Sequence, residues 1–155
     1  MSKSLLKTHI IEAPLTYKIR KNVLWPHIKN GNYSIDSDNQ KDTFHLGTFL
    51  DKKIISIGTF IKENNTKFNC NSQYRLRAMA THSNYRKINA GKTLFLKALD
   101  VLKNKNIELL WCDARIAAVE FYKSVNMKTL KGTYNIPSIG LHKTMYLYLN
   151  HSLKK

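Results

Sequence analysis

The sequence predicts a mixed α/β fold, in which a sheet with both parallel and antiparallel strands carries helices on both faces. Apolar, β-branched runs alternate with stretches in which apolar residues recur at helical spacing. Two of the runs are separated only by Asp51-Lys52, which is typical of an antiparallel hairpin. Because the chain has 155 residues, we expect one domain, residues 1–155, around one core.

The first elements are expected to be a strand and a helix. Lys7 to Glu12 has strand character, and Pro14 marks the break after it. Apolar residues at helical spacing predict a helix from Leu15 to Trp25, which Pro26 closes. The polar stretch from Asn30 to Asp42 is expected to be a loop, either a functional flap or a solvated connector.

The middle of the chain predicts a hairpin, a strand, a helix and a buried strand. The hairpin strands are Thr43 to Leu50 and Lys53 to Ile61, and the next strand is Tyr74 to Thr81. A helix is expected from Asn89 or Ala90 to Lys103. Ile107 to Cys112 is nearly all apolar, as expected of a buried parallel strand.

The last third predicts a helix and a final pair of strands. Asp113 is well placed to cap a helix from Ala114 to Val125. Lys128 to Ile136 and Thr144 to Leu149 are expected as strands around a turn at residues 137–140. The sequence contains no internal repeat and no low-complexity segment.

Composition excludes several classes of protein. No apolar run approaches the roughly 18 residues that span a bilayer, so no membrane segment is expected. Cys70 and Cys112 form no CxxC pair, so neither a metal site nor a disulfide framework is expected. The N-terminus lacks the features of a secretory signal, which predicts a cytoplasmic protein. The net charge of +16 favours anionic partners: phosphorylated small molecules, acidic substrates or, non-specifically, nucleic acid.

A basic turn between a strand and a helix is the most informative stretch: Arg86-Lys87-Ile88-Asn89-Ala90-Gly91-Lys92. Such a turn exposes the first unpaired N–H groups of the helix, which together with the helix dipole favour an anion such as phosphate. Gly91 allows close backbone approach, and three basic side chains add positive charge.

Two motifs resemble the GNAT superfamily of acyl-CoA-dependent N-acetyltransferases. Arg86-x-x-Asn89-x-Gly91 is similar to the family's Gln/Arg-x-x-Gly-x-Gly/Ala loop, which cradles the CoA pyrophosphate. Residues 118–127, AVEFYKSVNM, are similar to its later pattern Ala-x-x-Phe-Tyr-x-x-x-Gly-Phe. The resemblance covers about residues 5–149. The sequence is also similar to a branch of small bacterial members of this superfamily. It implies a mostly antiparallel central sheet, splayed at its middle strands.

The chain departs from the family pattern at several positions. Lys87 and Asn89 stand where the loop usually has glycines, although Asn tolerates a left-handed backbone best among the other residues. Arg115 stands where many members have an asparagine, and Asn126-Met127 replaces Gly-Phe. These departures concern the cofactor contacts more than the fold.

The resemblance implies acetyl-CoA as cosubstrate and assigns residues to it. The pantetheine arm would run beside one strand, with an N–H near Ala80 or Thr81 polarising the thioester carbonyl. The cofactor-binding residues implied are Met79, Ala80, Thr81, Arg86, Lys87, Asn89, Ala90, Gly91 and Lys92.

The catalytic residues implied are Tyr122 and His142. Tyr122 matches the tyrosine that protonates the CoA thiolate in the family, although an aromatic anchor would look the same. His142, expected in a loop facing the acceptor, is the first candidate for the base that deprotonates the amine. A structural histidine is as compatible with the sequence, and Asp113, Glu120 or a water molecule are alternatives.

Electrostatics favours one class of acceptor. Only ten acidic residues oppose the positive field, so a polycation such as a polyamine would be repelled. We therefore expect a small amine that carries an anionic group, such as an amino acid derivative. Edge strands after Lys128 could pair two subunits into a homodimer.

Two other functions fit the sequence. The altered loop would suit a non-catalytic acyl-CoA-binding sensor or assembly module. The charge would suit a basic nucleic-acid-binding domain. Its possible contacts are Lys18, Arg20, Lys21, Arg75 and Arg77.

Overall fold

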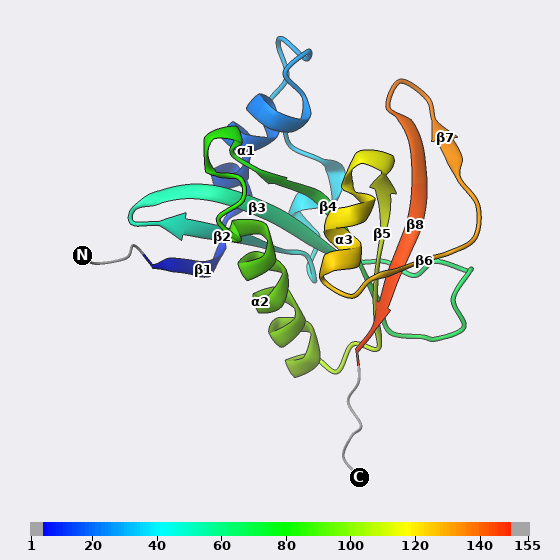
Figure 1. Ribbon diagram of the computed structural model, residues 1–155. Coiled ribbons are helices and arrows are strands. Elements are labelled where there is room, and N and C mark those ends of the chain that lie inside the picture. Colours follow the sequence, from blue (N-terminus) through cyan, green and yellow to red (C-terminus); the bar gives the residue numbers. More distant parts are fainter. Residues whose placement is uncertain (1–4, 150–155) are drawn as a thin grey trace. The chain divides into compact units, whose positions relative to one another are not determined.

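A computed structural model describes residues 5–149 of the chain. They group into two compact units, one made of residues 5–61 and 76–100 and the other of residues 62–75 and 101–149. The strand order is β1-β2-β3-β4-β5-β8-β6, and β7 also pairs with β8 (Figure 1). Pairing of β4 with β5 is parallel, whereas β1–β2, β2–β3, β5–β8, β6–β8 and β7–β8 are antiparallel. The predicted mixed, mostly antiparallel sheet is confirmed.

The first unit contains the predicted hairpin and the long helix. Its strands are β1 (Leu6–Ile11), β2 (Phe44–Leu50), most of β3 (Lys53–Lys62) and the end of β4 (Gln73–Thr81). Helix α2 (Ala90–Asn104) begins in this unit and buries Leu94, Phe95 and Ala98 completely. Each large apolar side chain so buried stabilises the fold by about 1.5–3 kcal/mol.

Close packing in this unit depends on a glycine. A Cβ added to Gly58 of β3 would lie 3.1 Å from Leu94 Cδ2 and 3.3 Å from Phe60 Cε1. Any larger residue would therefore push the helix away from the strand or displace the phenyl ring. The helical periodicity of α2 predicted its inward face, and Gly58 is what allows that face to approach.

The predicted helix from Leu15 to Trp25 is helical but irregular. It consists of a 3₁₀ turn η1 (Ala13–Thr16), α1 (Tyr17–Ile19) and a π-helical turn η2 (Arg20–Leu24). Trp25 N–H donates to the Arg20 carbonyl oxygen at 2.9 Å, five residues back. The expected loop after it holds a short 3₁₀ turn, η3 (Asp36–Asn39), in which Asp38 is buried. The loop is therefore attached to the core and is not a fully solvated connector.

The second unit holds the remaining strands and a short helix. Its strands are β5 (Leu109–Arg115), β6 (Lys128–Thr129), β7 (Tyr134–Ile136) and β8 (Gly140–Tyr148). The turn η5 (Ile116–Ala118) leads into α3 (Val119–Ser124). Phe68, Leu109 and Trp111 form a buried apolar cluster in this unit.

Three predictions about the second unit are wrong in detail. Asp113 does not cap a helix: it lies in β5 opposite Thr144, because strand pairing with β8 continues to Arg115. The strand predicted from Lys128 to Ile136 divides into β6 and β7, with Gly132 between them at φ 98°. Strand β8 begins at Gly140, before the predicted Thr144, so His142 lies in a strand and not in a loop.

The pairing of β4 with β5 is short. It is registered only from Gln73↔Leu109 to Arg75↔Trp111, although β4 continues to Thr81 and β5 to Arg115. The registered pairing of the two middle strands therefore ends at Arg75 and Trp111, and the predicted splay beyond it stays a prediction. Ala78, inside β4, has a left-handed backbone with φ 50°, a conformation typical of a bulge that re-aims a strand.

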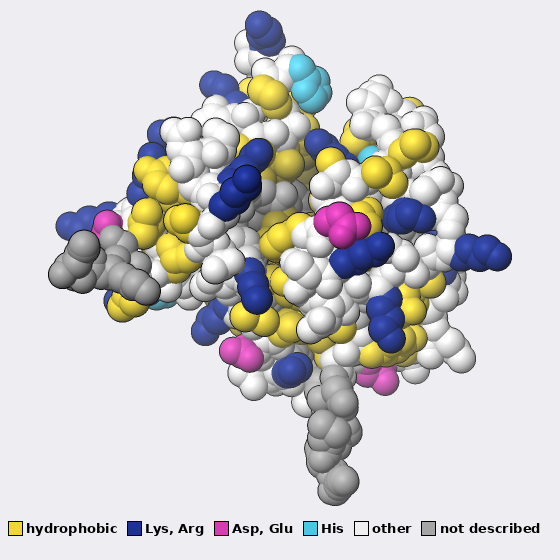
Figure 2. Space-filling model, in the orientation of Figure 1, with side chains coloured by type: hydrophobic (Ala, Val, Ile, Leu, Met, Phe, Trp, Pro, Cys, Tyr) yellow, Lys and Arg dark blue, Asp and Glu magenta, His cyan; other side chains and the backbone are white. Residues whose placement is uncertain are grey.

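Basic side chains are spread over the visible surface. Figure 2 shows Lys and Arg spread over this face, with few Asp and Glu among them. Among residues 5–149, no helix combines the length and the apolar character that crossing a membrane requires.

Candidate active site

The basic turn has the backbone geometry of a glycine-rich loop without its glycines. Lys87 and Asn89 both have φ 69°, in the left-handed region. These are the two positions where the resembled loop carries glycines, so the departures in sequence leave the backbone shape in place. Thr93 N–H makes the first helical hydrogen bond, to the Asn89 carbonyl oxygen at 2.8 Å. The N–H groups of residues 90–92 therefore precede the intrahelical ladder.

The turn is fastened to the sheet of its own unit. His82 N–H donates to the Ile55 carbonyl oxygen of β3 at 2.7 Å. The Nδ1 of His82 accepts from Asn84 N–H at 3.1 Å, and Thr48 of β2 donates its hydroxyl to the Ala90 carbonyl oxygen at 3.4 Å. These contacts fix where the helix begins, and sequence reasoning did not find them.

Charge and exposure at the turn suit an anion. Arg86, Lys87 and Lys92 are all solvent-exposed, whereas Ala90 is only 2% exposed. The positive end of the 15-residue helix α2 adds to these charges. The arrangement can hold a phosphate-like group by backbone donors and by long-range charge.

Backbone groups at the end of β4 are directed to the two opposite edges of the strand. Ser56 of β3 donates its hydroxyl to the Ala80 carbonyl oxygen at 3.3 Å, and its oxygen lies 3.0 Å from the Thr81 hydroxyl. With His82 N–H also bonded to β3, the groups of residues 80 and 82 face that strand. Because backbone groups of successive strand residues alternate in direction, we expect those of Thr81 to face the opposite edge.

Tyr122 lies in α3 and is 8% exposed. Burial, with a smaller contribution from Cys112, raises its pKa well above 10.0. Its ring packs edge-to-face on Phe121 at 5.3 Å, and no hydrogen bond to its hydroxyl occurs among the described residues. The phenol therefore stays protonated near neutral pH, with its proton free to be donated.

His142 in β8 is 4% exposed. Its Nδ1 lies 2.7 Å from the Gly140 carbonyl oxygen. A carbonyl can only accept, so Nδ1 carries the proton and a neutral imidazole has its lone pair on Nε2. Within residues 5–149 no group bonds to Nε2, so this nitrogen can act as a base.

The two carboxylate alternatives are less suited to that role. Asp113 accepts from Arg75 Nη2 at 2.8 Å and from the Tyr134 hydroxyl, so its oxygens are engaged. The side chain of Glu120 is 88% exposed and lies 3.8 Å from Lys123 Nζ, as expected of a solvated helix position.

The predicted site residues fall into two groups. Those from Met79 to Lys92 all lie in the first unit, and Tyr122 and His142 lie in the second. Around His142 the second unit gathers Tyr134, Asp113 and Thr144, of which sequence reasoning had weighed only Asp113. No local signal could have found the other two, because they meet through strand pairing.

Two expected nucleic-acid contacts are wrong. Arg20 is completely buried against Asp38, and Arg75 is paired with Asp113 and Glu63. Neither guanidinium is available to a phosphate backbone. Among the described residues, no group of three or more His, Cys, Asp and Glu could hold a metal ion.

Comparison with known proteins identifies the class of protein. The model of the acetyltransferase (GNAT) family matches residues 11–127. The chain therefore belongs to the GNAT family of acetyltransferases, as its two motifs predicted.

Individual relatives agree with this assignment. The chain is 35% identical over 148 residues to the uncharacterized N-acetyltransferase YitI of Bacillus subtilis (strain 168), covering 96% of this chain and 99% of that protein. The crystal structure of a putative N-acetyltransferase from Lactobacillus plantarum superposes with a TM-score of 0.74 at 16% identity, over 94% and 99% of the two chains. An aminoglycoside 6'-N-acetyltransferase complexed with coenzyme A gives 0.76 at 9% identity, over 94% and 98%.

Proposed function

We propose that the protein transfers an acetyl group from acetyl-CoA to the primary amine of a small molecule, directly within a ternary complex. The observation that carries the proposal is the turn before α2, where Lys87 and Asn89 keep the left-handed backbone. That geometry leaves the N–H groups of residues 90–92 for the CoA pyrophosphate.

The chemistry needs a polarised carbonyl, a neutral amine and a proton for the departing thiolate. In the proposed mechanism the Thr81 N–H, on the edge of β4 that faces away from β3, polarises the thioester carbonyl. His142 Nε2 takes the proton from the amine, and the Tyr122 hydroxyl donates its proton to the thiolate. The burial of Tyr122 keeps that proton in place until the thiolate forms.

Direct transfer is favoured over an acyl-enzyme because neither thiol is activated. Burial raises the pKa of the Cys112 thiol, which is 2% exposed. Burial and the Glu108 charge also raise the pKa of Cys70. A covalent intermediate on cysteine requires a thiolate, and both environments oppose one.

The acceptor is proposed to be a small amine with an anionic group. The carboxylates of Asp113 and Glu63 are already engaged by Arg75, and the Tyr134 ring already has Lys67 Nζ 5.3 Å from its centre. A polycationic acceptor would therefore find these carboxylates and this aromatic face taken, within a net charge of +16.

Calorimetry with acetyl-CoA tests the binding half of the proposal through one matched pair of variants. Asn89→Val forces a β-branched residue into a left-handed backbone, a strain of about 1–3 kcal/mol, and should weaken binding roughly 5- to 150-fold. Asn89→Gly keeps the conformation and should bind as the wild type does. The proposed CoA-binding turn would be contradicted if acetyl-CoA binding were weakened equally in both variants, or if the wild type showed no saturable binding.

Turnover on a panel of amino acids, their amides and polyamines tests the catalytic half. Tyr122→Phe should lower kcat by about 10²-fold or more and leave acetyl-CoA affinity unchanged. A wild-type protein that binds acetyl-CoA and acetylates no amine would support a non-catalytic acyl-CoA-binding module. Polyamines as the best acceptors would overturn the electrostatic argument.

A further inference from the structure

Tyr134 of β7 connects the candidate base to a fixed carboxylate. Strand β7 runs beside β8 (Figure 1), and Tyr134 is the cross-strand partner of His142. The two ring centres are 6.1 Å apart and the ring planes are inclined by 26°. Its hydroxyl donates to Asp113 Oδ1 and lies 3.2 Å from Thr144 Oγ1. The tyrosine is thus held at its hydroxyl end while its ring face lies against the imidazole.

The carboxylate that holds Tyr134 is itself immobilised. Asp113 Oδ2 accepts from Arg75 Nη2 at 2.8 Å, and the Arg75 guanidinium lies 5.0 Å from the Trp111 ring centre. Burial, followed by the hydrogen bond to Asp113, raises the pKa of Tyr134 to about 12. The hydroxyl therefore remains a donor to Asp113 at the pH values where the enzyme would work.

The orientation of the His142 ring decides which nitrogen can accept a proton. With Nδ1–H directed at the Gly140 carbonyl oxygen, Nε2 has the lone pair. A half-turn of the ring about its bond to Cβ would remove this hydrogen bond and the tautomer preference that it imposes. A planar ring that faces the imidazole from the neighbouring strand restricts the space for that rotation.

We propose that Tyr134 is a positioning residue: its ring, clamped by Asp113, holds the His142 imidazole with Nδ1 protonated and Nε2 available as the base. The orientation of the His142 ring does not depend on the proposed function. The consequence of that orientation for catalysis does rest on the proposed function. The other charged groups nearby are Arg115, the strand partner of His142 on β5, and Lys67, which lies over the Tyr134 ring.

Nitrogen NMR of the full-length protein labelled with ¹⁵N-histidine tests the proposal without any substrate. His142→Gln identifies the signals of His142. In the wild type at a pH where the ring is neutral, these signals should show the Nδ1–H tautomer. Tyr134→Leu, which keeps apolar bulk and removes the planar ring, should shift them towards a mixture of tautomers. Tyr134→Phe, which keeps the ring, should retain most of the wild-type signal.

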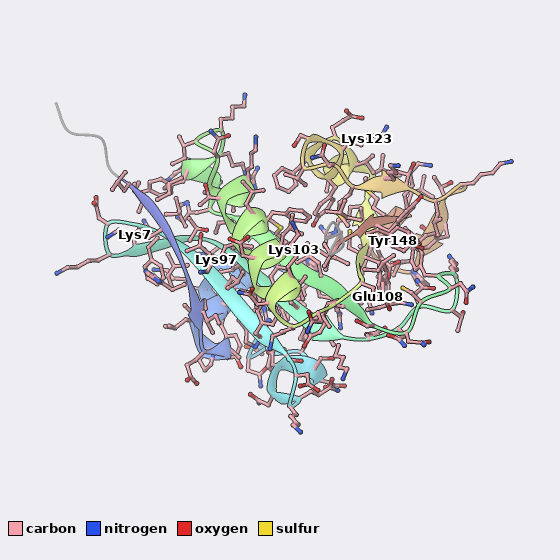
Figure 3. The ribbon with its side chains drawn as sticks, turned by 90° about the horizontal axis from the view of Figure 1, so that it is seen from below. Lys7, Lys97, Lys103, Glu108, Lys123 and Tyr148 are labelled. Atoms are coloured by element: carbon pink, nitrogen blue, oxygen red, sulfur yellow. The ribbon has the colours of Figure 1, made fainter. Side chains whose placement is uncertain are left out.

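Tyr148 provides the matched control. It is the last residue of β8, is 55% exposed and packs edge-to-face on Tyr146 with 5.9 Å between ring centres (Figure 3). Tyr148→Leu makes the same chemical change on the same strand and should leave the His142 signals unaltered. A wild-type tautomer in Tyr134→Leu would overturn the proposal, as would an equal shift in Tyr148→Leu.

Kinetics with the best amine of the panel separates this proposal from the proposed function. If His142 is the base, Tyr134→Leu should lower kcat roughly 10-fold or more without changing the KM for acetyl-CoA, and Tyr134→Phe should recover most of that loss. A shifted tautomer with unchanged kcat would leave the positioning role intact and would remove His142 from the mechanism.

Discussion

Each unit contains one cluster in which an arginine, an aspartate, a hydroxyl group and a histidine meet. We call the one in the first unit the core cluster, consisting of Arg20, Asp38, Thr59 and His45. We call the one in the second unit the sheet cluster, consisting of Arg75, Asp113, Tyr134 and His142. The chemical groups correspond almost one to one. Both histidines are buried, and the two clusters differ in the exposure of the ion pair and in how the histidine is satisfied.

The core cluster is closed. Arg20 binds Asp38 through two hydrogen bonds of 2.8 Å, and the side chains are 0% and 1% exposed. Both nitrogens of His45 have partners: Nδ1 lies 2.8 Å from the Thr59 hydroxyl and Nε2 lies 3.1 Å from the Asp38 carbonyl oxygen. The Nε2 must carry the proton, which leaves His45 no lone pair for chemistry.

The sheet cluster is open. The side chains of Arg75 and Asp113 are 21% and 22% exposed, and only Nδ1 of His142 has a partner among the described residues. The comparison shows that a structural histidine and a candidate base differ by one unsatisfied nitrogen. The core cluster is therefore expected to determine stability, and the sheet cluster to determine activity.

Replacing each of the two histidines with glutamine should give the largest effects. His142→Gln removes the proposed base and should lower kcat by about 10²- to 10⁴-fold. Its free energy of unfolding should change less than that of His45→Gln, because only one ring nitrogen of His142 has a partner among the described residues. His45→Gln should show the opposite pattern. Steady-state acetylation and urea unfolding of both variants measure this, and comparable kcat losses in the two would remove the distinction.

Breaking the core ion pair should give the largest loss of stability. Asp38→Ala leaves the Arg20 guanidinium buried without its counter-charge, at a cost of about 3–5 kcal/mol. Urea unfolding followed by circular dichroism would measure the loss. If the protein proves too unstable to purify, Asp38→Asn, which keeps an acceptor oxygen, should show a smaller destabilisation. A loss below about 1 kcal/mol in Asp38→Ala would contradict the closed cluster.

The core cluster should also make stability depend on pH. Burial lowers the pKa of His45 below its ordinary 6.5, more than the Asp38 contacts raise it. A lowered pKa means that the unfolded chain binds the proton more tightly, so the free energy of unfolding should fall as the pH drops below about 6.5. His45→Gln should remove this part of the slope. An unchanged slope would assign it to other groups.

Asp38 should add a second loss of stability at lower pH. Burial, the largest single influence, raises its pKa, but the hydrogen bonds from Arg20 and from Ile35 N–H, together with the charges of Arg20 and His45, outweigh burial and lower the pKa below 3.8. The stability from this carboxylate is therefore present above about pH 3.8 and is lost as the pH falls through the lowered value.

Breaking the sheet ion pair should give the smallest change in stability. Asp113→Ala removes contacts of partly exposed groups, for which solvent screening reduces the contribution to roughly 1 kcal/mol or less. The same variant should disturb the His142 tautomer no more than Tyr134→Phe does, because both changes remove the Tyr134–Asp113 hydrogen bond and leave the aromatic ring in place. A destabilisation as large as that of Asp38→Ala would show that exposure does not separate the clusters.

Much of the fold could be predicted because its signals are local. The periodicity of α2 and the Asp51-Lys52 turn each lie within one short segment. Asp113 shows the limit: a residue after an apolar run suits a helix cap or a strand equally well. Its partners, Arg75 and Thr144, are far away in the sequence, and they decide in favour of the strand.

The candidate site also has features that could be predicted from local sequence and others that depend on distant residues. The left-handed backbone of Asn89 was foreseeable from the preference of asparagine, whereas that of Lys87 had no signal in the side chain. The burial of Arg20 depends on Asp38, 18 residues later, and on Thr59, 39 residues later. Contacts of this kind follow from the topology of the sheet, which a single sequence specifies only indirectly.

The free N–H groups at the start of α2 have a consequence for isotope exchange. Amide hydrogens without a hydrogen-bond acceptor exchange rapidly with heavy water, as those of Gly91 and Lys92 should, whereas the ladder beginning at Thr93 protects the rest of the helix. A bound phosphate would supply the missing acceptors and slow the exchange. Mass spectrometry of the peptide spanning this turn could therefore report occupancy of the loop before any acetyl acceptor has been identified.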